Sequence, residues 1–212
     1  MNIYLEKFNN QNEKEHEVFE QLRNYAEANN VPIIKRDSLV LIQSLLNMIN
    51  AKTMLEVGTA IGYSALGFAI SKDDLIIDTI ERNEEMYHQA MKNIKALNMD
   101  NRINVIFDDA LLVDNSILKT YDVIFIDAAK AQYQKFFDKY APLLNENGVI
   151  LTDNIIFHGC VENQENLSKN VRSMVKKIDN YNHYLNTLEE YNTYYIDSGD
   201  GLAITMRKKK WN

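Results

Sequence analysis

Two apolar runs of the sequence end in side chains that could bind a metal ion. The run Val-Ile-Phe-Ile is followed by Asp127, and the run Val-Ile-Leu-Thr is followed by Asp153 and Asn154. If these runs form adjacent parallel strands, the two carboxylates meet at one edge of a sheet and repel each other unless a cation lies between them. Two carboxylates and an amide oxygen suit Mg²⁺ or a similar hard ion. We therefore predict a divalent-metal site at these three residues. The alternative is that they cap separate helices and have no common role.

A lysine near this set could act as a base. Lys130 lies three residues after Asp127, so it can reach a substrate that the metal holds. Beside a dication in a partly dry pocket the ammonium form is disfavoured, and the neutral amine can remove the proton of a hydroxyl group. His158 could also face the substrate, although a lone histidine on a loop more often has no such role.

Three further strand ends could bind a nucleoside. Gly58 and Gly62 follow the first strand, and a glycine there allows a tight turn and the close approach of a ligand. Their Gly-x-x-x-Gly spacing fits the dinucleotide motif poorly. Glu81 ends the second strand and could accept hydrogen bonds from ribose hydroxyls, while Asp109-Ala110 after the third strand could present a carboxylate to an adenine amino group. Together they predict an adenosine pocket at the carboxyl edge of the sheet.

Alternating strands and helices must position these side chains. The expected strands are 53–57, 75–80, 103–107, 121–126 and 149–152, with helix-like segments between them. This spacing predicts βαβ units and a doubly wound, mostly parallel sheet. Helices are expected at 13–29 and from Asp37 or Ser38, as the cap, to about residue 50. A helix at 166–185 precedes two strands, 187–195 and 201–206, that we expect to form an antiparallel hairpin.

The composition agrees with one globular domain. The chain has 212 residues, of which 46% are hydrophobic and 25% charged, and the formal net charge is -7. We expect a single domain over 1–212, with N-terminal helices in 1–50 and the α/β core in 51–212. The negative charge argues against nonspecific nucleic-acid binding. The absence of a long apolar run and the polar start predict a cytoplasmic protein with no membrane partner.

Four motifs carry a resemblance to a known family. Over about residues 35–206 the sequence resembles the cation-dependent O-methyltransferases of the catechol and caffeoyl-CoA type. The resemblance lies in the motifs EVGTAIGYS, IERNE, FIDAAK and TDN. The resemblance implies a Rossmann-like class I methyltransferase fold with a seven-stranded sheet, S-adenosylmethionine as methyl donor, Mg²⁺ or a similar ion, and a homodimer. It assigns the metal to Asp127, Asp153 and Asn154, catalysis to Lys130 and Asp127, and cofactor binding to Leu39, Gly58, Ser64, Glu81, Asp109, Ala110 and Asp127. Leu39 stands where the family has a methionine.

Longer segments indicate a narrower group. The sequence is similar to the bacterial tRNA 5-hydroxyuridine methyltransferases, which make 5-methoxyuridine at the anticodon wobble position. The similar segments are VIFIDAAKAQYQKFF, ILTDNIIFHG, KIDNYNHYL and SGDGLAI. The implied partner is the anticodon loop of a tRNA. The 5-hydroxyl and C4 carbonyl of the base, like the adjacent oxygens of a catechol, can chelate one metal ion. Lys169, Arg172 and Lys176 fall on one face of the expected helix, where they could contact phosphates.

Two other functions remain open from the sequence. The first is methylation of small catechol-like phenols, for which a stripe of cationic side chains would be irrelevant. The second is a module that binds S-adenosylmethionine without catalysis, which would leave Lys130 and the metal set without a role. A chelator distinguishes the module from an enzyme, because only the enzyme loses metal-dependent turnover. A nicotinamide dehydrogenase is disfavoured by the glycine spacing.

Overall fold

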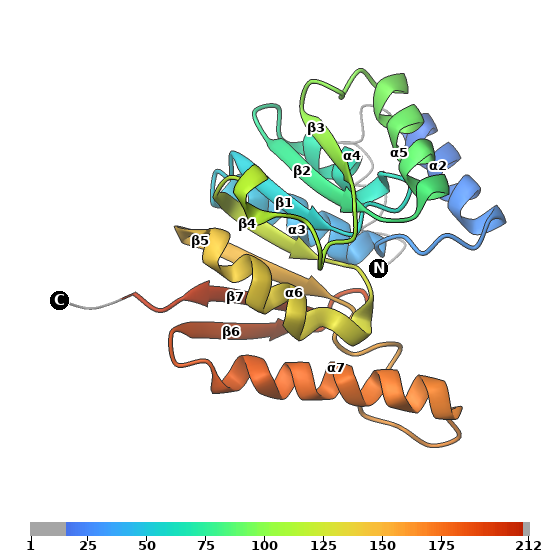
Figure 1. The fold of residues 1–212 in the computed structure, drawn as a ribbon. Coiled ribbons are helices and arrows are strands. Elements are labelled where there is room, and N and C mark those ends of the chain that lie inside the picture. The colour runs from blue at the N-terminus through green and yellow to red at the C-terminus, as the bar shows by residue number, and fades with distance from the viewer. Residues whose placement is uncertain (1–15, 210–212) are drawn as a thin grey trace.

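The computed structural model describes residues 16–209, which form one seven-stranded sheet with helices on both faces (Figure 1). The helices are α2 (His16–Ala28), α3 (Arg36–Met48), α4 (Tyr63–Ser71), α5 (Glu84–Ala96), α6 (Tyr133–Tyr140) and α7 (Lys169–Thr187), with short 3₁₀ turns η2 (Asn115–Ile117), η3 (Lys130–Gln132) and η4 (Ala141–Leu143). The strands are β1 (Thr53–Val57), β2 (Ile76–Glu81), β3 (Ile103–Phe107), β4 (Tyr121–Ile126), β5 (Leu144–Asp153), β6 (Tyr191–Ile196) and β7 (Leu202–Arg207).

The strand order is β3-β2-β1-β4-β5-β7-β6. Strands β1 to β5 pair in parallel, whereas β7 pairs antiparallel with both β5 and β6. The predicted doubly wound sheet with an antiparallel C-terminal hairpin is therefore confirmed. The order reverses between β1 and β4, which is the point where open α/β sheets bind ligands beyond the carboxyl ends of their strands.

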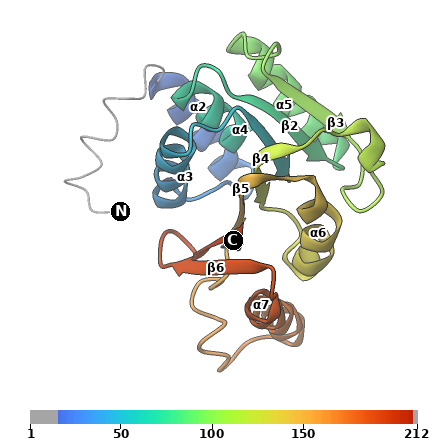
Figure 2. The same ribbon diagram turned by 90° about the vertical axis from the view of Figure 1, so that its left-hand side faces the viewer.

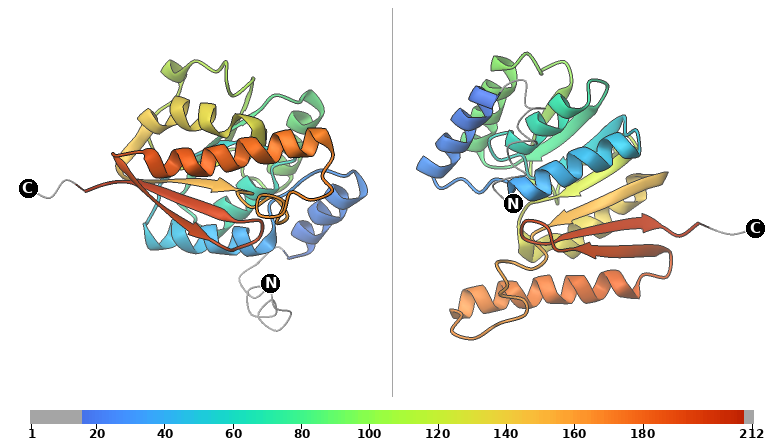
Figure 3. Two further views of the ribbon diagram at one scale, coloured as in Figure 1. Left: turned by 90° about the horizontal axis from the view of Figure 1, so that it is seen from below. Right: turned by 180° about the vertical axis from the view of Figure 1, so that it is seen from behind.

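Successive side chains of each strand enter two separate cores. Met54 of β1 packs with helices α2 to α5, whereas its neighbour Leu55 packs with α6 and α7. The alternation follows from the pleat, which sends consecutive side chains to opposite faces. Figure 2 shows α3 and α6 on opposite sides of the sheet, and Figure 3 shows α7 alongside the β6–β7 hairpin. Both faces are covered, as the nearly continuous apolar sequences of β4 and β5 predict.

Several expected element boundaries were wrong: β5 begins at Leu144 rather than at 149, and α7 begins at Lys169 rather than at 166. Helix α3 begins at Arg36 with Lys35 before it, and no side chain caps it. The Ser38 side chain, one of the two expected caps, is buried and turned toward the sheet. The strand expected at 187–195 begins only at Tyr191, because α7 continues to Thr187. The first fifteen residues, including part of the expected helix 13–29, lie outside the described residues.

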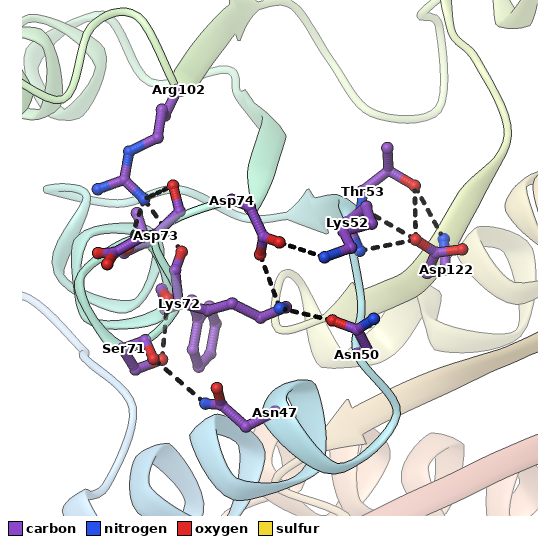
Figure 4. Close-up of polar contacts among 12 residues, drawn as sticks. Asn47, Asn50, Lys52, Thr53, Ser71, Lys72, Asp73, Asp74, Arg102 and Asp122 are labelled. Atoms are coloured by element: carbon purple, nitrogen blue, oxygen red, sulfur yellow. Dashed lines mark hydrogen bonds and ion pairs between the residues drawn. The ribbon is translucent and has the colours of Figure 1, made fainter.

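Polar contacts fix the amino edge of the sheet, at the opposite end from the predicted site (Figure 4). The Asp122 Oδ2 atom accepts the backbone N–H groups of Lys52 at 2.8 Å and Thr53 at 3.1 Å, which joins the start of β4 to the start of β1. Arg102 Nη1 donates to the carbonyl oxygen of Ala69 at 2.6 Å near the end of α4. Cations at helix C-termini are favourable because the carbonyl groups there lack helical partners. These contacts join β1 to β4 and the end of α4 to the start of β3.

None of the helices formed within residues 16–209 has the length and apolar character needed to cross a membrane.

Candidate active site

A cavity of about 880 Å³ opens at the carboxyl edge of the parallel strands. Its wall includes residues at the ends of β1, β2, β3 and β4, the segment 29–35 between α2 and α3, the loop after β5, and the β6–β7 turn. Most of the side chains that the sequence singled out therefore reach a common space, although they come from distant parts of the chain.

The turn after β1 lies against the end of β4. Gly58 has φ +105°, and a Cβ atom placed on it would lie 2.3 Å from the Asp127 backbone oxygen. The Asp127 N–H donates to the Val57 carbonyl at 3.0 Å. Glycine is thus required by backbone packing as well as by the turn. Gly62, with φ +80°, precedes α4, whose first N–H groups have no side-chain cap and lie beside the cavity.

Glu81 lies at the cavity end of β2. Its Oε2 atom accepts the N–H of Ala60 at 2.9 Å, and its Oε1 atom accepts the N–H of Asn83 at 2.7 Å. These bonds fix the carboxylate between two turns of the cavity wall. Each oxygen still has a second lone pair that can accept a ligand hydroxyl, so the geometry agrees with the predicted ribose contact.

A buried glutamate that the sequence analysis missed lies under the same turn. Glu56 accepts hydrogen bonds from Ser64 Oγ and Thr79 Oγ1, both at 2.5 Å. Burial raises the pKa of Glu56 to about 8. The two hydroxyl hydrogen bonds lower the pKa, and the negative charge of Asp127 raises it by a smaller amount. The only signal in the sequence was an acid inside the apolar run Met-Leu-Glu-Val. Ser64, expected to contact the cofactor, lines the cavity and also holds Glu56.

The raised pKa of Glu56 predicts how stability depends on pH. Between pH 4.5 and about 8 the folded chain keeps this proton while the unfolded chain releases it, so the free energy of unfolding falls as pH rises through this window. Glu56→Gln is expected to remove this contribution, on the order of a few kcal/mol. Urea titrations of both proteins at several pH values measure it. Parallel pH profiles would show that Glu56 is ionised in the folded protein.

Asp109 and Ala110 lie at the cavity end of β3. Asp109 Oδ1 accepts the N–H of Leu111 at 2.8 Å, and its Oδ2 accepts from Arg82 at 3.2 Å. The Leu111 hydrogen bond is the main cause of a lowered Asp109 pKa, with burial opposing it and Arg82 contributing. The Ala110 carbonyl accepts from Tyr140 at 2.5 Å. Both residues line the cavity, where Asp109 presents an ionised carboxylate.

Leu39 does not reach the cavity. Its side chain is buried, and its Cδ1 atom lies 3.0 Å from the position that a Cβ on Gly67 of α4 would occupy. It belongs to the core between α3 and α4 and is absent from the residues that line the cavity. The structure thus places Leu39 in packing rather than at the expected cofactor contact, because the inner face of α3 turns toward α4.

The predicted metal residues come together at the ends of β4 and β5. Ile126 pairs with Thr152, so Asp127 and Asp153 follow at the same level of adjacent strands. The Lys130 ammonium group donates a short hydrogen bond to Asn154 Oδ1. Asn154 Nδ2 lies 3.3 Å from Asp153 Oδ2. Asp127, Lys130 and Asn154 line the cavity, whereas Asp153 is fully buried behind its wall.

Ser38 supports this set, although the sequence suggested only a helix cap for it. Its Oγ atom lies 3.3 Å from Asp153 Oδ1 and 3.3 Å from the Ser198 carbonyl oxygen. One hydroxyl proton can serve only one of these acceptors at a time. Ser38 thus links α3, β5 and the β6–β7 turn behind the candidate metal residues.

The charges of this set favour a cation. Burial raises the pKa of Asp127, and burial followed by the charge of Asp127 raises the pKa of Asp153. The charge of Lys130 opposes both pKa increases. One positive charge cannot neutralise two carboxylates. Within residues 16–209 no three His, Cys, Asp or Glu side chains are grouped to hold a metal, so the set depends on the Asn154 amide oxygen. Two carboxylates and an amide oxygen with excess negative charge fit a hard divalent ion.

The cationic stripe is exposed on α7. Lys169, Arg172 and Lys176 face solvent, whereas Val175 and Ile178 on the opposite side of the helix are buried. Helix α7 begins at the same end of the molecule as the carboxyl edge of the parallel strands (Figure 1), so Lys169 and Arg172 lie toward the cavity end. His158, in the loop before α7, lines the cavity.

Comparison with known proteins identifies the family of this chain. The family model described as O-methyltransferase matches residues 9–209. Caffeoyl-CoA O-methyltransferase of Medicago sativa is 30% identical over 207 residues, covering 92% of this chain and 84% of the relative. A Dictyostelium discoideum protein provisionally named caffeoyl-CoA O-methyltransferase 3 is 34% identical over 71% of this chain. The match spans 64% of that relative, which is less than two thirds of its length.

Solved structures share the fold over nearly the whole chain. A Staphylococcus aureus protein, provisionally described as a caffeoyl-CoA O-methyltransferase, is 43% identical with a TM-score of 0.90, covering 97% of this chain and 98% of the other. An O-methyltransferase of Bacillus cereus, crystallised with SAH, is 23% identical with a TM-score of 0.77 and 91% coverage of both chains. The predicted Rossmann-like methyltransferase fold is thereby confirmed.

Proposed function

The chain belongs to the O-methyltransferase family, and on this basis we propose that it methylates 5-hydroxyuridine at the wobble position of tRNA. S-adenosylmethionine is the methyl donor in this proposal, and Mg²⁺ or a similar divalent ion is the cofactor. The observation that carries the chemistry is the meeting of Asp127, Lys130 and Asn154 in one cavity with Glu81 and the Gly58 turn. The cavity offers a nucleoside-binding half and an oxygen-rich half side by side.

The residues of the two halves have distinct tasks. Glu81, fixed by two backbone N–H groups, accepts hydrogen bonds from the ribose of the donor, and Asp109 faces its adenine. Asp127, Asp153 and Asn154 would hold the cation. When bound, the cation lowers the pKa of the acceptor hydroxyl, and the sulfonium of the donor makes its methyl group electrophilic.

Lys130 is the base. Its Nζ atom contacts Asn154, so it lies beside the ligand set and can accept the proton of a hydroxyl held there. The protein contributes further by holding donor and acceptor at reacting distance, which replaces an encounter in solution by a step within one complex. The acceptor hydroxyl gives its proton to Lys130, its oxygen forms a bond to the methyl carbon, and the sulfur–methyl bond breaks with its electron pair returning to the sulfur of the donor.

The tRNA acceptor is supported by chemistry and by charge. A 5-hydroxyuracil offers the hydroxyl and the C4 carbonyl as a chelating pair, and a wobble base is unpaired and can enter a cavity. Exposed Lys169 and Arg172 lie toward the cavity end of α7, where they can contact phosphates of the anticodon stem. We also propose a homodimer as the functional form.

Neutralising the stripe is expected to weaken tRNA methylation selectively. A triple change of Lys169, Arg172 and Lys176 to alanine removes up to three phosphate contacts, so KM for tRNA should rise about tenfold or more, with a shallower dependence on salt. Methylation of a free catechol should be unchanged. Three exposed lysines elsewhere, Lys92, Lys95 and Lys135, provide a charge-matched control. Unaltered tRNA kinetics would remove the stripe from the interface.

Glu81→Ala is expected to weaken binding of S-adenosylmethionine by about 1.5 to 3 kcal/mol, the usual contribution of charged hydrogen bonds. Calorimetry of both proteins measures the effect. Glu85→Ala is the control, since Glu85 is exposed on α5 outside the cavity wall. An affinity equal to that of the unchanged protein would exclude Glu81 from the cofactor site.

Nucleoside mass analysis tests the proposed reaction directly. tRNA that carries 5-hydroxyuridine is incubated with the protein, Mg²⁺ and isotopically labelled S-adenosylmethionine, and is then digested. Label in 5-methoxyuridine is the expected result, and a chelator should abolish it. Label in a small catechol but not in tRNA would favour the rival phenol acceptor. Cofactor binding without turnover on any acceptor would favour a noncatalytic module.

A further inference from the structure

The loop after β5 holds bulky residues in a rare backbone conformation. Asn154 has φ +58°, Phe157 +48° and His158 +55°, all in the left-handed region. Side chains other than glycine are disfavoured there, and residues held in such conformations cluster at functional sites. Phe157 and His158 both line the cavity. The two residues of this loop whose rings line the cavity are thus held in a disfavoured backbone conformation.

Asp200 in the β6–β7 turn holds His158. Its side chain is 4% exposed, and its Oδ1 atom accepts the backbone N–H of His158 at 2.6 Å. The same oxygen lies 3.5 Å from His158 Nδ1 and 3.6 Å from Lys35 Nζ. The Asp200 carbonyl oxygen also accepts the N–H of Ile156 at 3.0 Å. The turn and the loop are thus joined through main chain and side chain.

Asp200 Oδ1 lies 3.5 Å from Nδ1 of the His158 ring. A carboxylate can only accept hydrogen bonds, so this neighbour favours the tautomer with the proton on Nδ1, in which Nε2 is an acceptor. Over residues 16–209, Nε2 has no protein partner. The His158 side chain is 63% exposed and shares the cavity wall with Lys130 and Asn154. With the proton on Nδ1, a hydrogen-bond acceptor therefore faces the same cavity as the proposed base and metal residues.

We propose that His158 determines acceptor specificity by accepting a hydrogen bond at Nε2 from a ring N–H beside the chelating carbonyl of the acceptor. Asp200 is the positioning residue that fixes the ring. The inference rests on the proposed function. In 5-hydroxyuracil the hydroxyl at C5 and the carbonyl at C4 chelate the cation, and N3–H is the next group along the ring edge. A catechol has only a C–H group there, so this contact favours the uracil.

Two synthetic anticodon stem-loop RNAs test the contact. One carries 5-hydroxyuridine at the wobble position, and the other carries its N3-methyl derivative, which lacks the N–H. The unchanged protein should methylate the first with a kcat/KM about tenfold higher or more, because the second leaves the His158 acceptor unpaired. His158→Phe should lower this ratio to about one, and His158→Gln, which keeps a polar tip, should restore part of it.

Controls separate recognition from folding. His183→Phe is the matched variant, because His183 lies 3.5 Å from Asp179 in the same kind of pair but on exposed α7; it should keep the full ratio. Affinity for S-adenosylmethionine reports whether His158→Phe is folded, because the expected cofactor contacts are made at Glu81 and the Gly58 turn. A ratio of about one in the unchanged protein, or a full ratio in His158→Phe, overturns the assignment. Failure to methylate either RNA instead refutes the proposed acceptor, and this inference with it.

The role of Asp200 is tested by a double-mutant cycle. Asp200→Asn should reduce the discrimination between the two RNAs when His158 is present and should change nothing in the His158→Phe protein. A purely structural role predicts a lower melting temperature and slower methylation of both RNAs, with the ratio between them unchanged. Full discrimination between the two RNAs in Asp200→Asn would overturn the positioning role.

Discussion

Changing Lys130 to methionine is expected to slow methyl transfer by about 10²–10⁴-fold, the usual contribution of a general base. Methionine keeps much of the length and apolar volume of the lysine stem and removes only the group that accepts the proton. Because Lys130 contacts Asn154 and not the turns that hold Glu81, the affinity for S-adenosylmethionine should stay the same. Single-turnover rates and calorimetry measure the two effects separately.

Lys135→Met is the control for this change, since Lys135 is exposed on α6 and should retain full activity. Raising the pH should partly restore the Lys130→Met rate if hydroxide replaces the missing base. A rate within threefold of the unchanged protein would contradict the assignment of Lys130 as base, and some other group would have to take the proton.

Asp153→Asn is expected to abolish metal binding without lowering the stability of the fold. Asparagine has nearly the same shape but cannot carry the charge of the buried Asp153 carboxylate, so Mg²⁺-dependent turnover should fall by several orders of magnitude because the cation that lowers the pKa of the acceptor hydroxyl is lost. Without added metal the variant should melt at the same temperature as the unchanged protein or higher. The reason is that burial and the charge of Asp127 already disfavour the ionised Asp153, as its raised pKa shows.

Melting curves with and without Mg²⁺ provide the measurement. A ligand that binds only the folded protein raises its melting temperature, so Mg²⁺ should stabilise the unchanged protein and leave Asp153→Asn unaffected. Asp100→Asn, at an exposed position, should respond to Mg²⁺ like the unchanged protein. An equal Mg²⁺ shift in Asp153→Asn would place the ion elsewhere.

The chemistry-bearing strand ends could be predicted because they depend on local patterns. Asp127 and Asp153 each follow an apolar run long enough for a buried strand, and the carboxyl ends of parallel strands lie on one edge of a sheet. Glu81 was predicted in the same way. The order of β1, β4 and β5 then brings the ends together. The likeness of four short motifs to a known family led to the same residues independently.

Other parts of the site could not be predicted from local patterns. Glu56 lies inside a strand, and its partners Ser64 and Thr79 come from two other elements. Ser38 was expected to cap a helix, yet its hydroxyl faces Asp153, which is 115 positions away in the chain. Leu39, expected at the cofactor, packs against α4. In each case the contact depends on how neighbouring helices and strands pack against each other, which periodicity alone leaves open.

The sequence by itself determined the alternation of strands and helices, the antiparallel hairpin and the presence of two acids, an amide and a lysine at two strand ends. These follow from the hydrophobic period and from chain connectivity, which act over a few residues. Only the tertiary structure decided that Asp153 is buried behind Asn154 and that Asp200 reaches across to His158. The reason is physical: such contacts join segments far apart in the chain, and their geometry is fixed by the packing of the whole domain.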